Sequence, residues 1–562
     1  MTEQNIPLLE VEDLAVEFAT PDGVVRAVDG LSYSVTAGRT LAIVGESGSG
    51  KSVSSLAVMG LLQIPPARIV RGAVRFKGED LLTLSPKEHR AVCGAHIAMV
   101  FQDALTALNP VHTVGWQLTE ALRARRKMSR REAAGRAVEL LDMVKVPNAK
   151  ERIKDYPHQF SGGMRQRVMI ASALAMDPEV LIADEPTTAL DVTTQAEILD
   201  LIKRLQVSRG MAMLLITHDM GVVAEVADAV AVMRYGRIVE AGSAEDIFHD
   251  ARHPYTVRLL NSTVKLEQNQ RTAARAETST QARQPVLSVR NLSKVYGAST
   301  AWFGGNSHAL KAVDDVSLDL YPGENLGIVG ESGSGKTTLG RLILRTVEPS
   351  AGTVTYHGAG APMDVTGLSK QGLKAFHRDV RLVFQDPFAS LNPRMTVKEI
   401  IGDPLYVSGK MRGGAIEARV AELLTLVGLD PMAMERYPHA FSGGQRQRIG
   451  IARALALDPK IIIADEATAA LDVSIRAQIL DLLLDIQQKL GLSFIFISHD
   501  ISVVRYFCDR VAVMRLGKLV EVGTAEQICT QPQHPYTQSL ISAVPNPDPR
   551  NKRMLHRTRY VA

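Results

Sequence analysis

Gly45-Glu46-Ser47-Gly48-Ser49-Gly50-Lys51-Ser52 follows the apolar run Leu41–Val44 and decides how the rest of the chain is interpreted. The stretch fits the phosphate-loop pattern of glycine, four residues, glycine, lysine, and serine or threonine. Its small residues let successive backbone N–H groups surround a phosphate chain, and the helix that follows adds its positive N-terminus. The pattern predicts that Lys51 reaches the β- and γ-phosphates and that the Ser52 hydroxyl binds Mg²⁺.

A second copy of the pattern excludes the simplest alternative, a glycine-rich turn without a ligand. Gly330-Glu331-Ser332-Gly333-Ser334-Gly335-Lys336-Thr337 follows a matching strand-like run, Leu326–Val329. Two accidental copies in the same context are not credible. The sequence therefore predicts that the chain binds a nucleoside triphosphate, with Mg²⁺, at two sites.

The whole chain of 562 residues is one module written twice. Lys51 and Lys336 lie 285 residues apart, and the spacing between matching landmarks settles at 281 from Ser161 and Ser442 onward. The predicted domains are residues 1–263 and 286–562. A polar stretch at 264–285 has few large apolar residues and is predicted to be a flexible linker.

Composition limits the class of protein. Hydrophobic residues make up 46% and charged residues 22%, and the formal net charge is +4, which gives no support for a nucleic-acid surface. No apolar run approaches the roughly 20 residues that a membrane-spanning helix needs, so we expect the chain to stay in the cytosol. Its three cysteines have no metal-ligand spacing.

Continuous apolar runs alternate with helical stretches and predict an α/β fold. Strand-like runs at 180–183, 212–216 and 229–233 are typical of a buried parallel sheet. Each copy opens with alternating strand-like segments, and the region from 113 to about 144, with its counterpart at 397–427, is predicted to be a mainly helical insertion.

A carboxylate pair ends one predicted strand in each copy: Asp184-Glu185 and Asp465-Glu466. An aspartate at the end of a parallel strand beside a phosphate loop is placed to hold Mg²⁺, and the next glutamate can polarise an attacking water. An isolated Asp-Glu pair is more often a helix N-cap, but the phosphate loop in each copy reverses that preference.

Ser161-Gly162-Gly163-Met164 and Ser442-Gly443-Gly444-Gln445 each precede a helix-like run. Each segment is either a flexible helix start or a second anion-binding helix N-terminus.

Over nearly its whole length the chain resembles a fused pair of ATP-binding-cassette (ABC) ATPase domains. The resemblance implies, for each copy, a RecA-like phosphate-loop core, a β-rich subdomain and a helical subdomain. It also implies that cassettes pair head to tail, so that each ATP contacts one copy's phosphate loop and the other copy's Ser-Gly-Gly segment.

The family's motifs map onto both copies. Catalytic roles are implied for Glu185, His218, Glu466 and His499, and adenine stacking for Phe18 and Tyr296. Metal binding is implied for Ser52, Gln102, Asp184, Thr337, Gln385 and Asp465. The remaining nucleotide-site positions are Asp191, Asp472, both phosphate loops and both Ser-Gly-Gly segments. Met164 departs from the family's glutamine, and Ala467 stands where many members have proline.

His253–Thr256 and His534–Thr537 both read His-Pro-Tyr-Thr and are similar to the C-terminal extension of oligopeptide, dipeptide and nickel importer ATPases. The resemblance implies an ATPase that energises import of peptides or a related small solute. It implies two membrane permease subunits and an extracytoplasmic solute-binding protein as partners, and no nucleic acid. The expected location is peripheral, on the cytoplasmic face of the cell membrane, with membrane contact through the permeases only.

Two alternatives stay open. The solute could be nickel, an opine or another small molecule, because the solute never touches this chain. A soluble duplicated ATPase acting on ribosomes or DNA is less favoured, since the linker is short and mixed, and zinc cysteines are missing.

Overall fold

The computed structural model describes residues 7–21, 23–188, 190–267, 284–297, 310–358, 360–384, 386, 390–469, 471–558 and 560. The chain divides into two compact units. The first contains Met1–Thr263 together with Pro545–Arg557, and the second contains Val264–Val544 together with Thr558–Ala562.

The first unit is built on a six-stranded sheet with the order β10-β9-β3-β8-β7-β6, in which only β10 is antiparallel to its neighbour. Its strands are β3 (Thr40–Val44), β6 (Ile97–Val100), β7 (Val180–Asp184), β8 (Ala212–Thr217), β9 (Ala229–Arg234) and β10 (Arg237–Ser243). Every residue of β3, β7 and β8 is buried, which is why these strands read as unbroken apolar runs.

An antiparallel four-stranded sheet, β2-β1-β4-β5, makes the β-rich subdomain of this unit. Its strands are β1 (Pro7–Thr20), β2 (Gly23–Thr36), β4 (Ala67–Phe76) and β5 (Glu79–Asp80). Buried residues alternate with exposed ones along β2, because one face of the sheet covers the core.

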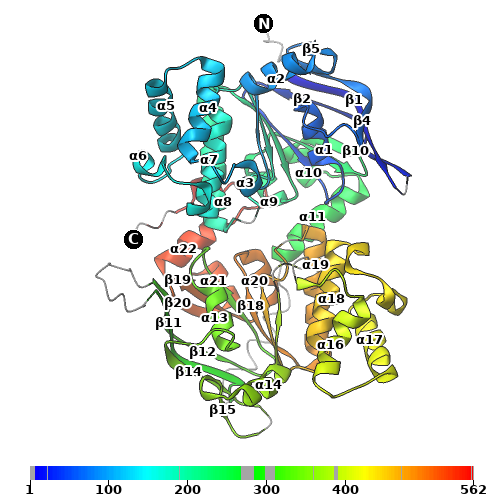
Figure 1. Ribbon diagram of the computed structural model, residues 1–562, viewed down its shortest axis with the longest axis vertical. Helices are drawn as coiled ribbons and strands as arrows, with labels where there is room; N and C mark the ends of the chain where they lie inside the picture. The colour runs from blue at the N-terminus through cyan, green and yellow to red at the C-terminus, as the bar shows by residue number, and fades with distance from the viewer. Residues whose placement is uncertain are drawn as a thin grey trace. The chain divides into compact units, whose positions relative to one another are not determined.

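Helices complete the first unit, and the 113–144 insertion is helical as predicted. They are α1 (Lys51–Val58), α2 (Pro86–Ala95), α3 (Ala104–Ala107), α4 (Val114–Arg126), α5 (Arg130–Met143), α6 (Ala149–Arg152), α7 (Gly162–Leu174), α8 (Val192–Arg209), α9 (Met220–Val226), α10 (Ala244–His249) and α11 (Pro254–Glu267). Figure 1 shows α4, α5 and α6 on the side of this unit opposite to β1, β2 and β4.

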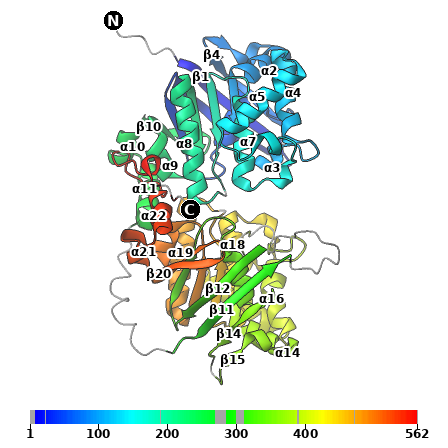
Figure 2. The ribbon, with the colours of Figure 1, turned by 90° about the vertical axis from the view of Figure 1, so that its left-hand side faces the viewer.

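The second unit repeats this architecture with sheet orders β12-β11-β14-β15 and β16-β17-β18-β13-β19-β20. Its strands are β11 (Leu287–Tyr296), β12 (Leu310–Leu320), β13 (Asn325–Val329), β14 (Ala351–Tyr356), β15 (Met363–Asp364), β16 (Val380–Val383), β17 (Ile461–Asp465), β18 (Ser493–Ile497), β19 (Arg510–Arg515) and β20 (Lys518–Thr524). Its helices are α13 (Lys336–Ile343), α14 (Lys370–Asp379), α16 (Val397–Val407), α17 (Gly414–Leu426), α18 (Gly443–Leu455), α19 (Val473–Leu490), α20 (Ile501–Phe507), α21 (Ala525–Thr530) and α22 (Pro535–Ser542). Figure 2 shows β11, β12, β14 and β15 side by side as one sheet.

The units differ from the predicted domains in two respects. Residues 545–557, assigned from sequence to the domain 286–562, belong to the first unit because they pack on its helices. The predicted linker 264–285 begins within α11, which continues to Glu267, and most of the rest of that linker lies outside the described residues. None of the helices that the structure describes is long and apolar enough to cross a lipid bilayer.

Candidate functional site

The phosphate loop of each unit joins a buried strand to a helix, β3 to α1 and β13 to α13. In the first unit Lys51 is 6% exposed, and its Nζ donates to the carbonyls of Gly45 (2.7 Å) and Glu46 (2.9 Å). Lys336 makes the matching bonds to Gly330 (2.8 Å) and Glu331 (2.7 Å). The ammonium group is therefore held inside its own loop in both copies.

Glycine is required in the loop because neighbouring backbone lies too close for a side chain. A Cβ atom on Gly50, where φ is +99°, would lie 2.2 Å from the Ala27 carbonyl oxygen on β2. A Cβ on Gly45 would lie 2.2 Å from the Met233 carbonyl oxygen on β9. The sheet and the β-rich subdomain thus fix the loop from two sides.

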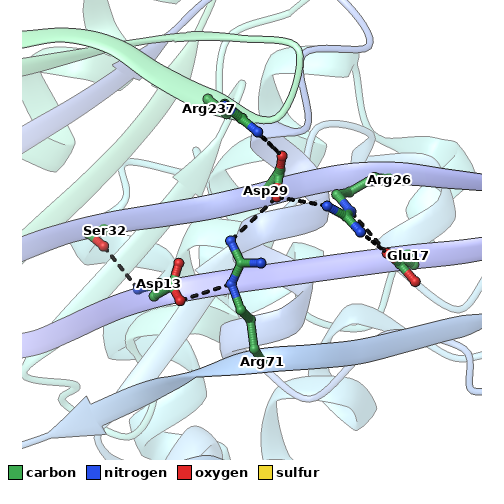
Figure 3. A network of polar contacts seen from close by, with 7 residues as sticks. All are labelled: Asp13, Glu17, Arg26, Asp29, Ser32, Arg71 and Arg237. Atoms are coloured by element: carbon green, nitrogen blue, oxygen red, sulfur yellow. Dashed lines mark hydrogen bonds and ion pairs between the residues drawn. The ribbon is translucent and has the colours of Figure 1, made fainter.

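An ion-pair network lies on β1, β2, β4 and β10 (Figure 3). Asp29 accepts from Arg237 (2.9 Å), Arg26 (3.3 Å) and Arg71 (3.4 Å). The hydrogen bond from Arg237 holds the pKa of Asp29 below its usual value, although burial opposes this. Asp29 therefore stays ionised and holds β2 to the turn after β9.

Backbone hydrogen bonds carry this support to the phosphate loop. The Asp29 N–H donates to the Gly236 carbonyl (2.8 Å), and the Gly236 N–H donates to the Ser49 carbonyl (2.9 Å). In the second unit Asp314, Gly517 and Ser334 repeat both bonds, each at 2.9 Å.

The tyrosine of each His-Pro-Tyr-Thr (HPYT) segment also supports the phosphate loop. The sequence did not predict this role. The Glu46 N–H donates to the hydroxyl of Tyr255 (3.0 Å), which is 2% exposed at the start of α11. The Glu331 N–H donates to Tyr536 in the same way (3.1 Å). In the sequence, the repeated HPYT segment indicated a resemblance to the peptide and nickel importer ATPases, but it did not indicate that its tyrosine contacts the phosphate loop.

The two carboxylates at the end of β7 differ in their surroundings. Asp184 is 5% exposed and accepts from the Ser52 hydroxyl (3.1 Å), and burial raises its pKa to about 6. Thr337 and Asp465 repeat this contact at 3.1 Å, and burial also raises the pKa of Asp465.

Glu185 accepts hydrogen bonds from three side chains: Gln102 (2.7 Å), Thr188 (2.9 Å) and the Nδ1 of His218 (2.9 Å). Burial opposes ionisation of Glu185, but the bonds from His218 and Thr188 outweigh it and lower the pKa to about 2. In the second unit His499 bonds Glu466 at 3.1 Å, whereas Gln385 lies outside the described residues.

Both glutamates have a strained backbone that sequence could not reveal. The φ angle is +46° at Glu185 and +48° at Glu466, a region that non-glycine residues rarely occupy. The N–H groups of these residues donate to Ile216 (2.8 Å) and Ile497 (2.9 Å) on the next strand. These bonds hold the turn that directs each glutamate side chain to its histidine.

The Ser-Gly-Gly segments begin helices in both copies, with Ser161 as N-cap of α7 and Ser442 as N-cap of α18. The side-chain oxygen of Gln445 accepts a hydrogen bond from the Ser442 N–H (3.0 Å), which completes a capping box. Met164 cannot accept that bond, so the first copy has only the serine cap.

The other predicted site residues lie on separate elements. Phe18 is half-buried on β1, and Tyr296 is 42% exposed at the end of β11, with the Lys294 ammonium 5.2 Å from its ring centre. Asp191 is the N-cap of α8, where it accepts from the Thr194 N–H (2.9 Å), and Asp472 is the N-cap of α19.

A buried loop lysine, a hydroxyl bonded to a strand-end aspartate, and a glutamate–histidine pair define a P-loop ATPase site, and the chain contains two. Comparison with known proteins gives the family. The model described as "ABC transporter" matches residues 28–188 and 313–469, and "Oligopeptide/dipeptide transporter, C-terminal region" matches 239–286 and 520–560. The chain belongs to the ABC transporter family, as the sequence predicted.

Curated relatives are similar over nearly the full chain. The glutathione import ATP-binding protein GsiA of Shigella dysenteriae serotype 1 is 49% identical, covering 97% of this chain and 91% of the relative. Its namesake from Escherichia coli K12 is 48% identical with the same coverage. A solved dimeric bacterial ABC transporter cassette is 30% identical, with a TM-score of 0.38, covering 42% of this chain and 98% of that one.

The match of the ABC transporter model to both copies confirms the predicted fold class of two ABC ATPase domains. The chain is an ATP-binding and ATP-hydrolysing subunit of an ABC transporter of the oligopeptide/dipeptide group. The roles of individual residues stay predictions.

The first prediction concerns the strand-end glutamates. Glu185→Gln and Glu466→Gln should each slow hydrolysis at their own site by about 10²- to 10⁴-fold, because the neutral amide lacks the negative charge that orients and polarises the attacking water. ATP affinity should stay nearly unchanged. Single-site turnover is measured beside nucleotide binding, with Glu79→Gln on β5 as the matched control. Normal turnover in both variants would remove these residues from the chemical step.

The second prediction concerns the HPYT tyrosine. In a Lys336→Ala background that leaves only the first site, Tyr255→Phe should weaken ATP binding by about 1 kcal/mol, roughly fivefold, because Glu46 loses its acceptor. A fluorescent ATP analogue reports the affinity. Tyr235→Phe, at a residue 78% exposed on the β9–β10 turn, is the control. Equal affinity in the Lys336→Ala protein with and without Tyr255→Phe would show that the hydroxyl does not support the loop.

Proposed function

We propose that the chain hydrolyses ATP with Mg²⁺ at two sites to drive import of glutathione or a similar short peptide. The observation that carries this proposal is that both units contain the same set of a loop lysine, strand-end carboxylates and a histidine. Each unit also contains the HPYT extension of a peptide-transporter family. The relatives named for glutathione import favour a peptide over nickel or an opine.

The residues present fit a magnesium ion. A hydroxyl and a carboxylate lie 3.1 Å apart in each unit, Ser52 with Asp184 and Thr337 with Asp465, and Mg²⁺ prefers oxygen ligands. The bound ion would neutralise charge on the β- and γ-phosphates. Gln102 and Gln385 complete the proposed ligand set.

The chain's own residues would divide the work of hydrolysis. The loop N–H groups and Lys51 bind the phosphates, and the anionic Glu185 orients a water for in-line attack. His218 holds Glu185 and is proposed to contact the γ-phosphate. The low pKa of Glu185, about 2, keeps it ionised throughout the physiological range. Lys336, Glu466 and His499 would do the same in the second unit.

Adenine stacking by Phe18 and Tyr296, and the nucleotide contacts of Asp191, Asp472 and the two Ser-Gly-Gly segments, rest on the family resemblance. These roles stay predictions. The half-exposed ring of Tyr296 is compatible with stacking.

We propose that the permease subunits dock beside the segment that follows Gln102. Large apolar side chains are exposed there: Leu105 (54%), Val111 (71%) and Trp116 (45%). A cavity of about 260 Å³ opens nearby, lined by Phe101, Leu108, Arg125 and Met169 among others. In the second unit Tyr406 (68%) and Val407 (74%) are exposed on α16. Exposed apolar groups of this kind are typical of protein interfaces.

An extracytoplasmic solute-binding protein would deliver the peptide to these permeases. The chain would then lie on the cytoplasmic face of the cell membrane, in contact with it through the permeases only.

The third prediction tests this assembly. In proteoliposomes with both permeases, glutathione-loaded binding protein should raise ATP turnover severalfold. Trp116→Ala combined with Leu105→Ala should abolish most of that rise but leave the turnover of the isolated chain unchanged. The matched control is Val24→Ala, at a residue 69% exposed on the β1–β2 hairpin. Full activity from the chain alone, without any stimulation, would contradict the proposal.

A further inference from the structure

The two compact units exchange the ends of their HPYT extensions. The first unit ends at Thr263 within α11, and the corresponding division in the second copy falls after Val544. These positions are 281 residues apart, the same spacing that relates the two copies. The residues that follow each division belong to the other copy's unit: Val264–Glu267 to the second and Pro545–Arg557 to the first.

The tail segment, residues 545–557, is recognised by a buried carboxylate of the first unit. Glu225 on α9 is fully buried, and its Oε1 accepts the N–H groups of Asn546 (3.1 Å), Arg553 (2.9 Å) and Met554 (3.0 Å). A buried carboxylate is costly unless donors compensate it. Among the described residues, the donors to the Glu225 carboxylate are these three backbone N–H groups of the tail segment.

Packing and charge complete the contact. Met554 is fully buried, and a Cβ on Gly221 at the start of α9 would lie 3.1 Å from the Cβ of Pro545. Arg557, whose side chain is 4% exposed, lies 4.0 Å from Asp200 on α8, and Arg550 donates to Glu245 on α10 (2.7 Å). The tail segment carries four Lys and Arg residues against one aspartate, so it complements the acidic side chains that face it.

The corresponding face of the second unit has different chemistry. Tyr506 stands at the position of Glu225, and Asp481 at that of Asp200. Asp481 accepts from the Tyr506 hydroxyl and from Lys265 (2.6 Å), which is the counterpart of Asn546. The α8–α9 face of the first unit therefore binds backbone N–H groups, whereas the corresponding face of the second unit binds a lysine side chain.

We propose that the α8–α9 face of the first unit is a specific docking site for the chain's own tail segment, with Glu225 as the recognition residue. Each ATPase unit is then completed by the other copy's extension. Because α9 begins directly after His218 and its N-cap Asp219, the docked tail segment packs against the helix that leaves the first catalytic centre.

A disulfide experiment tests the docking on the full chain. With Cys93, Cys508 and Cys529 replaced, Gly221→Cys and Pro545→Cys should form an intrachain disulfide, because their Cβ atoms lie near the 3.5–4.5 Å that the bond needs. Peptide mass spectrometry without reduction detects it. The matched control pairs Pro545→Cys with Ser502→Cys, the counterpart of Gly221 on α20, and should not cross-link.

Variants at the recognition residue complete the test. Glu225→Ala should lower cross-linking and speed tryptic cleavage after Arg553 and Arg557 by at least tenfold, whereas Glu225→Gln, which keeps an acceptor oxygen, should restore most of the protection. Tyr506→Ala should change neither. Cross-linking through Ser502→Cys instead, disulfides only between separate chains, or an unchanged cleavage rate in Glu225→Ala would overturn the proposal. If Glu225→Ala does not fold, the cysteine pairs decide alone.

Discussion

The structure of each unit depends on the close backbone packing around its phosphate loop. In the first unit, carbonyl oxygens of Ala27 and Met233 occupy the space that side chains on Gly50 and Gly45 would need. Gly236 and Tyr255 add hydrogen bonds from a β-turn and from the extension. The loop is therefore fixed by elements that lie far apart in the sequence, and these contacts orient its N–H groups.

The strand that ends beside this loop places two neighbouring carboxylates in opposite electrostatic surroundings. Burial raises the pKa of Asp184 to about 6, and a cation such as Mg²⁺ would favour the ionised form of this carboxylate. Hydrogen bonds instead lower the pKa of Glu185 to about 2. The left-handed backbone at Glu185 turns its side chain toward His218 rather than along the strand. One carboxylate is thereby suited to hold a metal ion and the next to act on water.

Much of this could be predicted from sequence, because the phosphate loop, the strand-end carboxylates and the repeat spacing are local patterns. The buried strands read as apolar runs, and both copies contain the phosphate loop, the strand-end Asp-Glu pair, the Ser-Gly-Gly segment and the His-Pro-Tyr-Thr segment. Three features could not be predicted, since each depends on contacts between distant segments: the backbone strain at Glu185, the hydrogen bond that the Glu46 N–H donates to Tyr255, and the burial of Glu225. Residues 545–557 group with the first unit, whereas the sequence placed them in the domain 286–562, for the same reason. Their polar, proline-rich sequence does not show which unit they pack against.

We propose that the chain binds ATP at two sites, one built on the phosphate loop of each unit. The most direct test is the number of ATP molecules bound per chain by the hydrolysis-deficient Glu185→Gln, Glu466→Gln double variant, measured by equilibrium dialysis with Mg²⁺. We expect two ATP molecules per chain, falling to one when Lys51→Ala or Lys336→Ala is added. One ATP per chain in the double variant, or a loss of both when a single lysine is replaced, would contradict it.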